Sequence, residues 1–141
     1  MLVFVGIDKY ITPVKTKGSI KNIFGIQIIT ILFWIFYDDE EDFEKGFFWH
    51  ERLHCFHWFE FFIFLFPVIY FFEGIIKSLF GLGYEEISFE REAYLNQLDP
   101  NYADNRKLYS SLKYIFPLNR KMVDLTPFRR KARKTVNGKL V

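Results

Sequence analysis

The pattern of apolar and polar positions divides the chain into a short β-rich start and a longer helical remainder. Residues 1–22 carry turn residues and mixed charge, and they lead into residues 23–37, where β-branched side chains are frequent. Such a run favours buried, paired strands. From Gly46 the chain is dense in aromatic residues and has no glycine until Gly74, which predicts one long helix, kinked near Pro67. Because this helix is apolar on nearly every face, we expect it to be buried on nearly every face.

Turn signals complete the predicted order of elements. The glycines within residues 81–83 end the long helix, and residues 84–98 form a second helix that stops at the turn of residues 99–100. A further short helix is expected over residues 106–116. The sequence therefore predicts an α+β fold, in which a short N-terminal β segment is followed by a helical core.

Charge is concentrated in two runs. The acidic run at residues 38–44 is expected to be a solvated loop, because it lacks the ligand alternation and the glycine of a calcium-binding EF-hand loop. A basic run covers residues 128–139. We therefore predict one domain over residues 1–127 and a basic C-terminal tail over residues 128–141. The tail is expected to be a solvated end, with contact to acidic lipid or nucleic acid as the alternative.

The composition is unusually apolar for a single small domain. Half of the 141 residues are hydrophobic and 19 are phenylalanine, so part of the apolar surface is expected to meet a membrane or another protein. A spanning helix needs about 20 mostly apolar residues. Residues 61–72 fall short of that length, are interrupted by Pro67 and are bounded by Glu60 and Glu73. We expect the aromatic segment 58–72 to lie in the core or on a membrane surface without crossing it.

Two features of the sequence bear on the cellular location of the protein. The single cysteine, Cys55, cannot form an internal disulfide, which fits a reducing compartment. The first residues lack the basic start and the apolar run of a signal peptide. We therefore expect an intracellular protein, with membrane association through residues 58–72 left open.

A motif with a specific chemical meaning lies at residues 50–54. His50-Glu51-Arg-Leu-His54 matches HExxH, in which two histidines four residues apart project from one helical face and can hold one Zn²⁺. Glu51 lies about 100° round the helix from His50, where it can reach a metal-bound water without binding the metal. Aromatic residues surround the motif, so unpartnered polar groups there would be costly to bury. We predict a zinc site with Glu51 as general base.

Residues 50–54 and 89–93 together resemble the HExxH…ExxA arrangement of gluzincin metallopeptidases, especially the membrane-linked CAAX-processing and HtpX types. That resemblance implies a zincin-like helical core, zinc, a peptide substrate, and Glu90 as the third metal ligand. Where those enzymes have an aspartate after the alanine, this chain has Tyr94. Through residues 87–94 the chain also resembles short, uncharacterised bacterial and phage proteins of the zincin-like kind.

Several other residues near the motif are candidates for supporting roles. Glu92 lies about 200° from Glu90 on the same helix, so we expect it to face solvent or an arginine, and it is the alternative third ligand. His57 follows the stripe of His50 and His54, and a packed histidine bonded to a carbonyl or carboxylate is favoured over a ligand role. Tyr94 and Tyr102 are candidates to stabilise an oxyanion.

The favoured function is a zinc-dependent hydrolase, a small metallopeptidase acting on a peptide or protein substrate. Zinc would activate water, and Glu51 would accept its proton. The first alternative is a non-catalytic zinc-binding or membrane-associated assembly protein, whose aromatic helix is an interaction surface. The second is a nucleic-acid binder that uses the basic tail, which we favour least.

Overall fold

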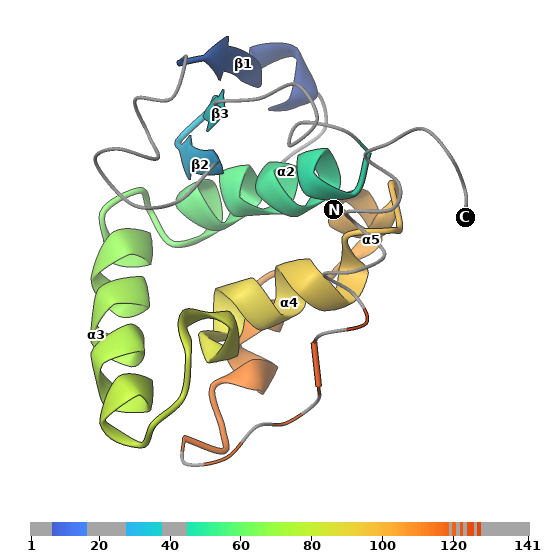
Figure 1. Ribbon diagram of the computed structural model, residues 1–141. Helices are drawn as coiled ribbons and strands as arrows, with labels where there is room; N and C mark the ends of the chain where they lie inside the picture. Colours follow the sequence, from blue (N-terminus) through green and yellow to red (C-terminus); the bar gives the residue numbers. More distant parts are fainter. Residues whose placement is uncertain are drawn as a thin grey trace.

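The computed structural model describes residues 7–16, 28–37 and 45–118, together with positions 120, 122, 124, 125 and 127. The acidic run at residues 38–44 and the basic tail lie outside the described residues. The predicted α+β class is confirmed, because a three-stranded sheet precedes the helices (Figure 1). In chain order the elements are η2 (Ile7–Tyr10), β1 (Thr12–Lys15), β2 (Ile28–Ile31), β3 (Trp34–Tyr37), α2 (Lys45–Glu60), α3 (Leu65–Leu79), η4 (Tyr84–Glu86), α4 (Ser88–Asn96), α5 (Tyr102–Asn105) and η5 (Ser110–Tyr114).

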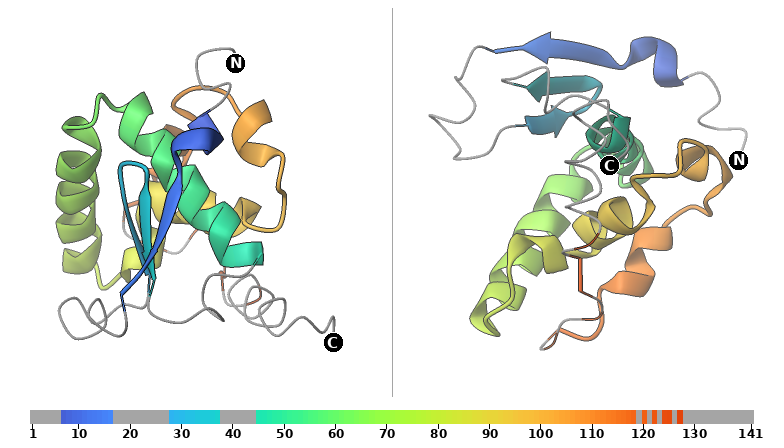
Figure 2. Two further views of the ribbon diagram at one scale, coloured as in Figure 1. Left: turned by 90° about the horizontal axis from the view of Figure 1, so that it is seen from above. Right: turned by 45° about the vertical axis from the view of Figure 1, so that its right-hand side comes forward.

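The sheet has the order β1-β3-β2 and lies against α2 on the side away from α4 (Figures 1 and 2). The central strand β3 pairs in parallel with β1 and antiparallel with β2. The predicted pairing of strands within residues 23–37 is confirmed for β2 and β3. Their burial is only partial, because Thr30 and Ile35 are the buried positions of these two strands. Because the strand order is β1-β3-β2, β2 forms an edge of the described sheet, and it also contacts α2.

The prediction of one long helix from Gly46 is wrong. The chain forms two helices, α2 and α3, whose axes are bent by 113°. The break lies at residues 61–64, where Phe62 and Ile63 have φ angles of 53° and 61°. Pro67 lies in the first turn of α3, where a missing backbone N–H costs little. The bend brings Phe61 into a buried cluster with Phe66, Ile87 and Phe89, and this packing offsets the unfavourable backbone of the turn.

The prediction of burial on nearly every face holds for α2 but is wrong for α3. Most of α2 from His50 onward is buried between the sheet and α4. α3 packs on one side only, against α2, η4 and α4, and its other side is not covered by described residues (Figure 1). The residues that α3 turns inward include its two charged ones, Glu73 and Lys77. Phe66 is also buried, whereas most of the other apolar residues of α3 are left on the outside.

The predicted helix over residues 84–98 is shorter and is preceded by the 3-10 turn η4. α4 packs against α2, and its Ala93 is fully buried in a cluster with Leu53, Phe56 and Ala103. This close approach of the two helices agrees with the small side chain at position 93. The helix predicted over residues 106–116 is wrong: that range contains only the short 3-10 helix η5, and the short helix α5 ends just before it.

Within the described ranges, no single helix has both the length and the hydropathy of a membrane span. α2 and α3 meet the criterion only when they are taken together across their 113° bend.

Candidate metal centre

Two histidines of α2 and one glutamate of α4 lie together in the interior. His50 and His54 are one helical turn apart, so both rings project from the same side of α2. Their Nε2 atoms are 3.2 Å apart. Glu90 approaches from α4, with its Oε2 3.1 Å from Nε2 of His50 and its Oε1 3.2 Å from Nε2 of His54. These three buried residues, here named the His–His–Glu cluster, are 4%, 6% and 7% exposed.

The spacing and the donor atoms of this cluster fit a divalent cation. Ligand atoms that bind zinc at about 2.0–2.1 Å with tetrahedral angles stand about 3.3–3.4 Å from one another. The three contacts of 3.1 Å, 3.2 Å and 3.2 Å are close to that spacing. Two imidazoles and a carboxylate are a donor set of catalytic zinc sites, whereas calcium and magnesium prefer oxygen ligands. The cluster could therefore hold one metal ion.

The hydrogen bonds of His57 determine which nitrogen of His54 is free of a proton. Burial lowers the pKa of His57 to about 4, so the ring is neutral near pH 7. Its Nε2 donates to Oε2 of Glu92 over 2.9 Å, which leaves Nδ1 of His57 as an acceptor. Nδ1 of His54 lies 3.3 Å from that acceptor and donates to it. When His54 loses its second proton to bind a metal, this hydrogen bond keeps the remaining proton on Nδ1, so the lone pair of Nε2 is directed into the His–His–Glu cluster.

The charges around the cluster favour a cation at its centre. Burial lowers the pKa of His54, but the carboxylate of Glu90 outweighs burial, and the net pKa is raised. Burial raises the pKa of Glu90, but His54 and His50 outweigh it, and that pKa falls well below its usual range. Both shifts arise because the buried carboxylate of Glu90 and a positive charge on His54 stabilise each other. A metal ion bound by the same atoms would supply that charge.

Glu51 follows His50 in α2 and is held by the sheet. Its Oε2 accepts a hydrogen bond of 2.6 Å from Oγ1 of Thr30 in β2, and the residue is 5% exposed. Its negative charge contributes to the raised pKa of both His54 and Tyr70, so its carboxylate lies within electrostatic reach of the site. Glu51 is not one of the three residues whose ligand atoms converge. Its role as general base stays a prediction.

Sequence reasoning missed two residues that contact the site from other elements. Thr30 orients Glu51, and Tyr70 of α3 donates a hydrogen bond of 2.8 Å to Oε1 of Glu90. Burial and the nearby Glu90 charge raise the pKa of Tyr70 strongly, so its hydroxyl remains protonated as a donor. No local pattern distinguishes this tyrosine from the seven others in the chain. Only the bend between α2 and α3 brings it to the site.

Glu92 lies apart from the His–His–Glu cluster and is the centre of a second buried network. The expectation that it faces solvent is wrong, since it is fully buried, while the expected arginine partner is confirmed. Arg106 donates from Nε to Oε1 over 2.8 Å and from a terminal nitrogen to Oε2 over 3.0 Å. Further donors to Glu92 are His57, Tyr102 and Ser110. α4 is covered by η5, and this contact excludes solvent from Glu92.

The two tyrosines proposed as oxyanion donors occupy different surroundings. The ring of Tyr94 contacts His50 edge to face, with ring centroids 4.5 Å apart, and its hydroxyl lies 2.9 Å from that of Tyr84. Tyr102 donates to Oε1 of Glu92 over 2.9 Å. Tyr94 therefore packs against a metal-ligand candidate, whereas Tyr102 belongs to the network of Glu92.

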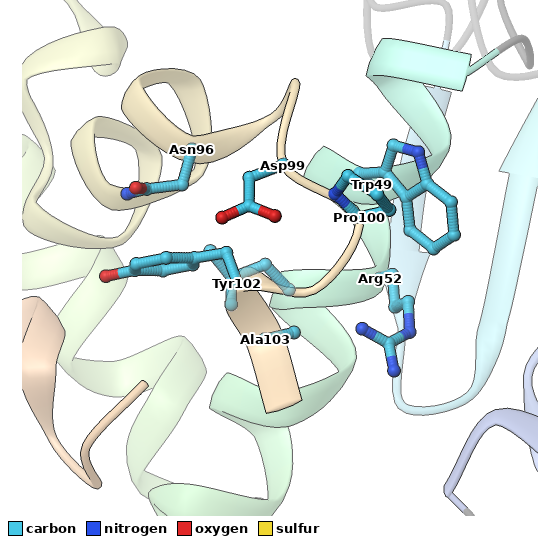
Figure 3. A pocket seen from close by; sticks show the side chains of 8 residues that line it. Trp49, Arg52, Asn96, Asp99, Pro100, Tyr102 and Ala103 are labelled. Carbon is cyan, nitrogen blue, oxygen red and sulfur yellow. The ribbon is translucent and has the colours of Figure 1, made fainter. Parts of the chain in front are cut away.

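A small surface cleft lies between α2 and the α4–α5 connection (Figure 3). Arg52 on its wall forms an ion pair of 3.0 Å with Asp104. The residues that line it are Trp49, Arg52, Leu53, Asn96, Asp99, Pro100, Tyr102 and Ala103. None of them belongs to the His–His–Glu cluster, so this cleft is separate from the candidate metal centre.

The chain was compared with protein-family models, with curated proteins and with solved structures, and none of these comparisons gave a match. The candidate site is therefore argued from its geometry alone, in which two histidines and a glutamate come together from two packed helices.

Proposed function

We propose that this protein is a metal-dependent hydrolase of the zincin-like kind, with zinc as its metal and peptide bonds as its substrate. One observation carries the proposal: a buried His–His–Glu cluster has ligand-like spacing, and a further buried carboxylate, Glu51, follows His50 in the same helix. The two histidines would hold the ion through Nε2, and Glu90 through its carboxylate. Three protein ligands leave a coordination position for water, as in catalytic rather than structural zinc sites.

Bound zinc would supply Lewis-acid polarisation of a carbonyl oxygen and lower the pKa of water. The chain's own residues would then handle the proton. Glu51 accepts a hydrogen bond of 2.6 Å from Thr30, so its carboxylate is held by β2. It would accept a proton from the attacking water and transfer it to the leaving amine. Tyr70 and His57 would act indirectly, because they hydrogen-bond Glu90 and His54 respectively.

Peptides are the proposed substrate class partly because of the strand beside the site. β2 is an edge of the described sheet and carries Thr30, the partner of Glu51. A strand edge can pair with an extended chain through backbone hydrogen bonds. Such pairing would place a peptide bond near Glu51. The HExxH…ExxA resemblance points to the same substrate class.

The decisive experiment separates metal binding from proton transfer at two glutamates. Metal content would be measured on purified protein, and hydrolysis on a quenched fluorescent peptide library. Glu51→Gln keeps the side-chain size but cannot accept the proton, so it should retain zinc while hydrolysis falls by about 10²-fold or more. Glu90→Gln removes an anionic ligand, so zinc itself should be bound more weakly. Glu85→Gln, in η4 and outside the site, is the matched control and should change neither.

Two outcomes would count against the proposal. If wild-type protein holds less than about 0.2 equivalents of zinc after metal-replete purification, the proposed metal centre is wrong. Full zinc occupancy without hydrolysis that depends on Glu51 would instead favour the alternative, a metal-binding structural or assembly protein.

A further inference from the structure

The outer side of α3 has an apolar character that is unusual for a helix in water. Large hydrophobic side chains are exposed along α3 and at the turns on both of its ends, and Phe64 and Leu79 are 81% and 80% exposed. This surface, here named the α3 face, consists of Phe62, Phe64, Leu65, Val68, Phe71, Phe72, Ile75, Ile76, Leu79 and Phe80. A contiguous apolar surface of this kind marks an interaction site.

The charged residues of the segment point the opposite way. Between Glu60 and Glu85 the sequence has only two charged residues, Glu73 and Lys77. Both face the protein interior, 6% and 1% exposed, and form an ion pair of 2.8 Å. Glu73 also accepts hydrogen bonds from the backbone and the hydroxyl of Ser88 at 2.7 Å and 2.6 Å. The α3 face itself therefore carries no charge.

We propose that the α3 face lies in the hydrocarbon of a lipid bilayer, with α3 parallel to the membrane plane. An outward apolar surface with ionisable groups turned inward and paired is what hydrocarbon requires. A surface that binds another protein normally has a polar rim. Residues 61–84 instead place no charged side chain around the α3 face, which favours lipid over a protein partner. The 15 residues of α3 extend about 22 Å, less than a span requires, so an in-plane position is favoured.

This membrane surface is independent of metal binding but lies next to the candidate centre. Tyr70, on the inner side of α3, donates to Glu90 over 2.8 Å. The same helix therefore contacts the bilayer with one side and a metal ligand with the other. Because a helix with its side chains is about 10 Å across, the His–His–Glu cluster would sit close to the membrane surface.

The experiment is co-sedimentation of the full chain with vesicles of phosphatidylcholine alone, in about 0.5 M salt, where long-range electrostatic attraction is screened. Wild-type protein should bind. Phe71→Glu combined with Leu79→Glu places two charges on the α3 face and should lower the partition coefficient by about tenfold or more. The control is Leu108→Glu combined with Leu112→Glu, two leucines that are 43% exposed outside α3 and should leave binding unchanged. Circular dichroism would verify that both variants are folded.

Three results would overturn the proposal. Wild-type protein could remain in the supernatant, or bind only anionic vesicles at low salt, which would assign the contact to basic residues. Both double variants could lose binding equally. Light scattering could instead show that wild-type protein is a dimer and that the α3 variant is a monomer, with neither protein binding neutral vesicles. In that case the occupant of the α3 face would be a second copy of the chain.

Discussion

At the scale of single residues, the candidate centre depends on side chains that control protons as much as on the ligands. The hydrogen bonds from His54 to His57 and from His57 to Glu92 hold a proton on Nδ1 of His54, so Nε2 is the nitrogen that a metal ion would bind. Such outer hydrogen bonds typically contribute 10-fold to 100-fold to metal affinity. His57 therefore belongs to the site although it holds no metal.

His57→Phe tests this role, because phenylalanine fills a similar space beside Phe66 and Phe89 but has no acceptor nitrogen. We expect zinc affinity to fall by about 10-fold to 100-fold, measured by competition with a chelating dye. Tyr94→Phe is the control, since it keeps the ring contact with His50 and should leave affinity unchanged. Equal affinity of wild type and His57→Phe would disprove the tautomer-fixing role.

At the scale of elements, α3 is attached to the rest of the protein through buried charge as well as apolar contacts. Lys77 pairs with Glu73 and also donates to the backbone carbonyl of Glu86 in η4. The carboxylate of Glu86 in turn pairs with Arg91 of α4. These buried ion pairs and the hydrogen bond of Lys77 connect α3, η4 and α4.

Lys77→Ala should destabilise the protein, because it leaves the buried carboxylate of Glu73 without its charged partner. The expected loss is about 3–5 kcal/mol of unfolding free energy, which urea titration can measure. Lys113→Ala, at an exposed lysine of η5, should change stability by no more than about 0.5 kcal/mol. A loss for Lys77→Ala as small as that of the control would show that the ion pair has no anchoring role.

At the scale of the whole molecule, a metal held by α2 and α4 would link the two helices of the core. A ligand that binds only the folded state at about 100 times its Kd adds about 2.7 kcal/mol of stability. For a chain of this size, that corresponds to a Tm rise of about 6–14 °C.

Chelation should therefore lower the Tm of zinc-loaded wild-type protein by about that amount, measured by scanning calorimetry. His54→Ala, which lacks one ligand, should unfold at the same temperature with and without chelator. A chelator effect of equal size in both proteins would place the stabilising metal elsewhere.

Local geometry explains what could be predicted from the sequence. Residues four apart on any α-helix share a face, so the proximity of His50 and His54 follows from their spacing alone. The same rule separates Glu90 from Glu92, and in the structure Glu90 lies with His50 and His54 whereas Glu92 contacts His57. The β-branched run likewise predicted the pairing of β2 with β3. These conclusions require only the periodicity of regular elements.

Tertiary structure decided what depends on contacts between distant segments. The break at residues 61–64 is stabilised by packing of Phe61 against Phe89, and no proline or glycine marks it in the sequence. The same bend leaves the outer side of α3 uncovered and directs Tyr70 toward Glu90. The sequence by itself therefore determined the donor residues and the elements that carry them. Only the folded chain decided their partners and the exposed faces, because long-range packing outweighs local preference at those positions.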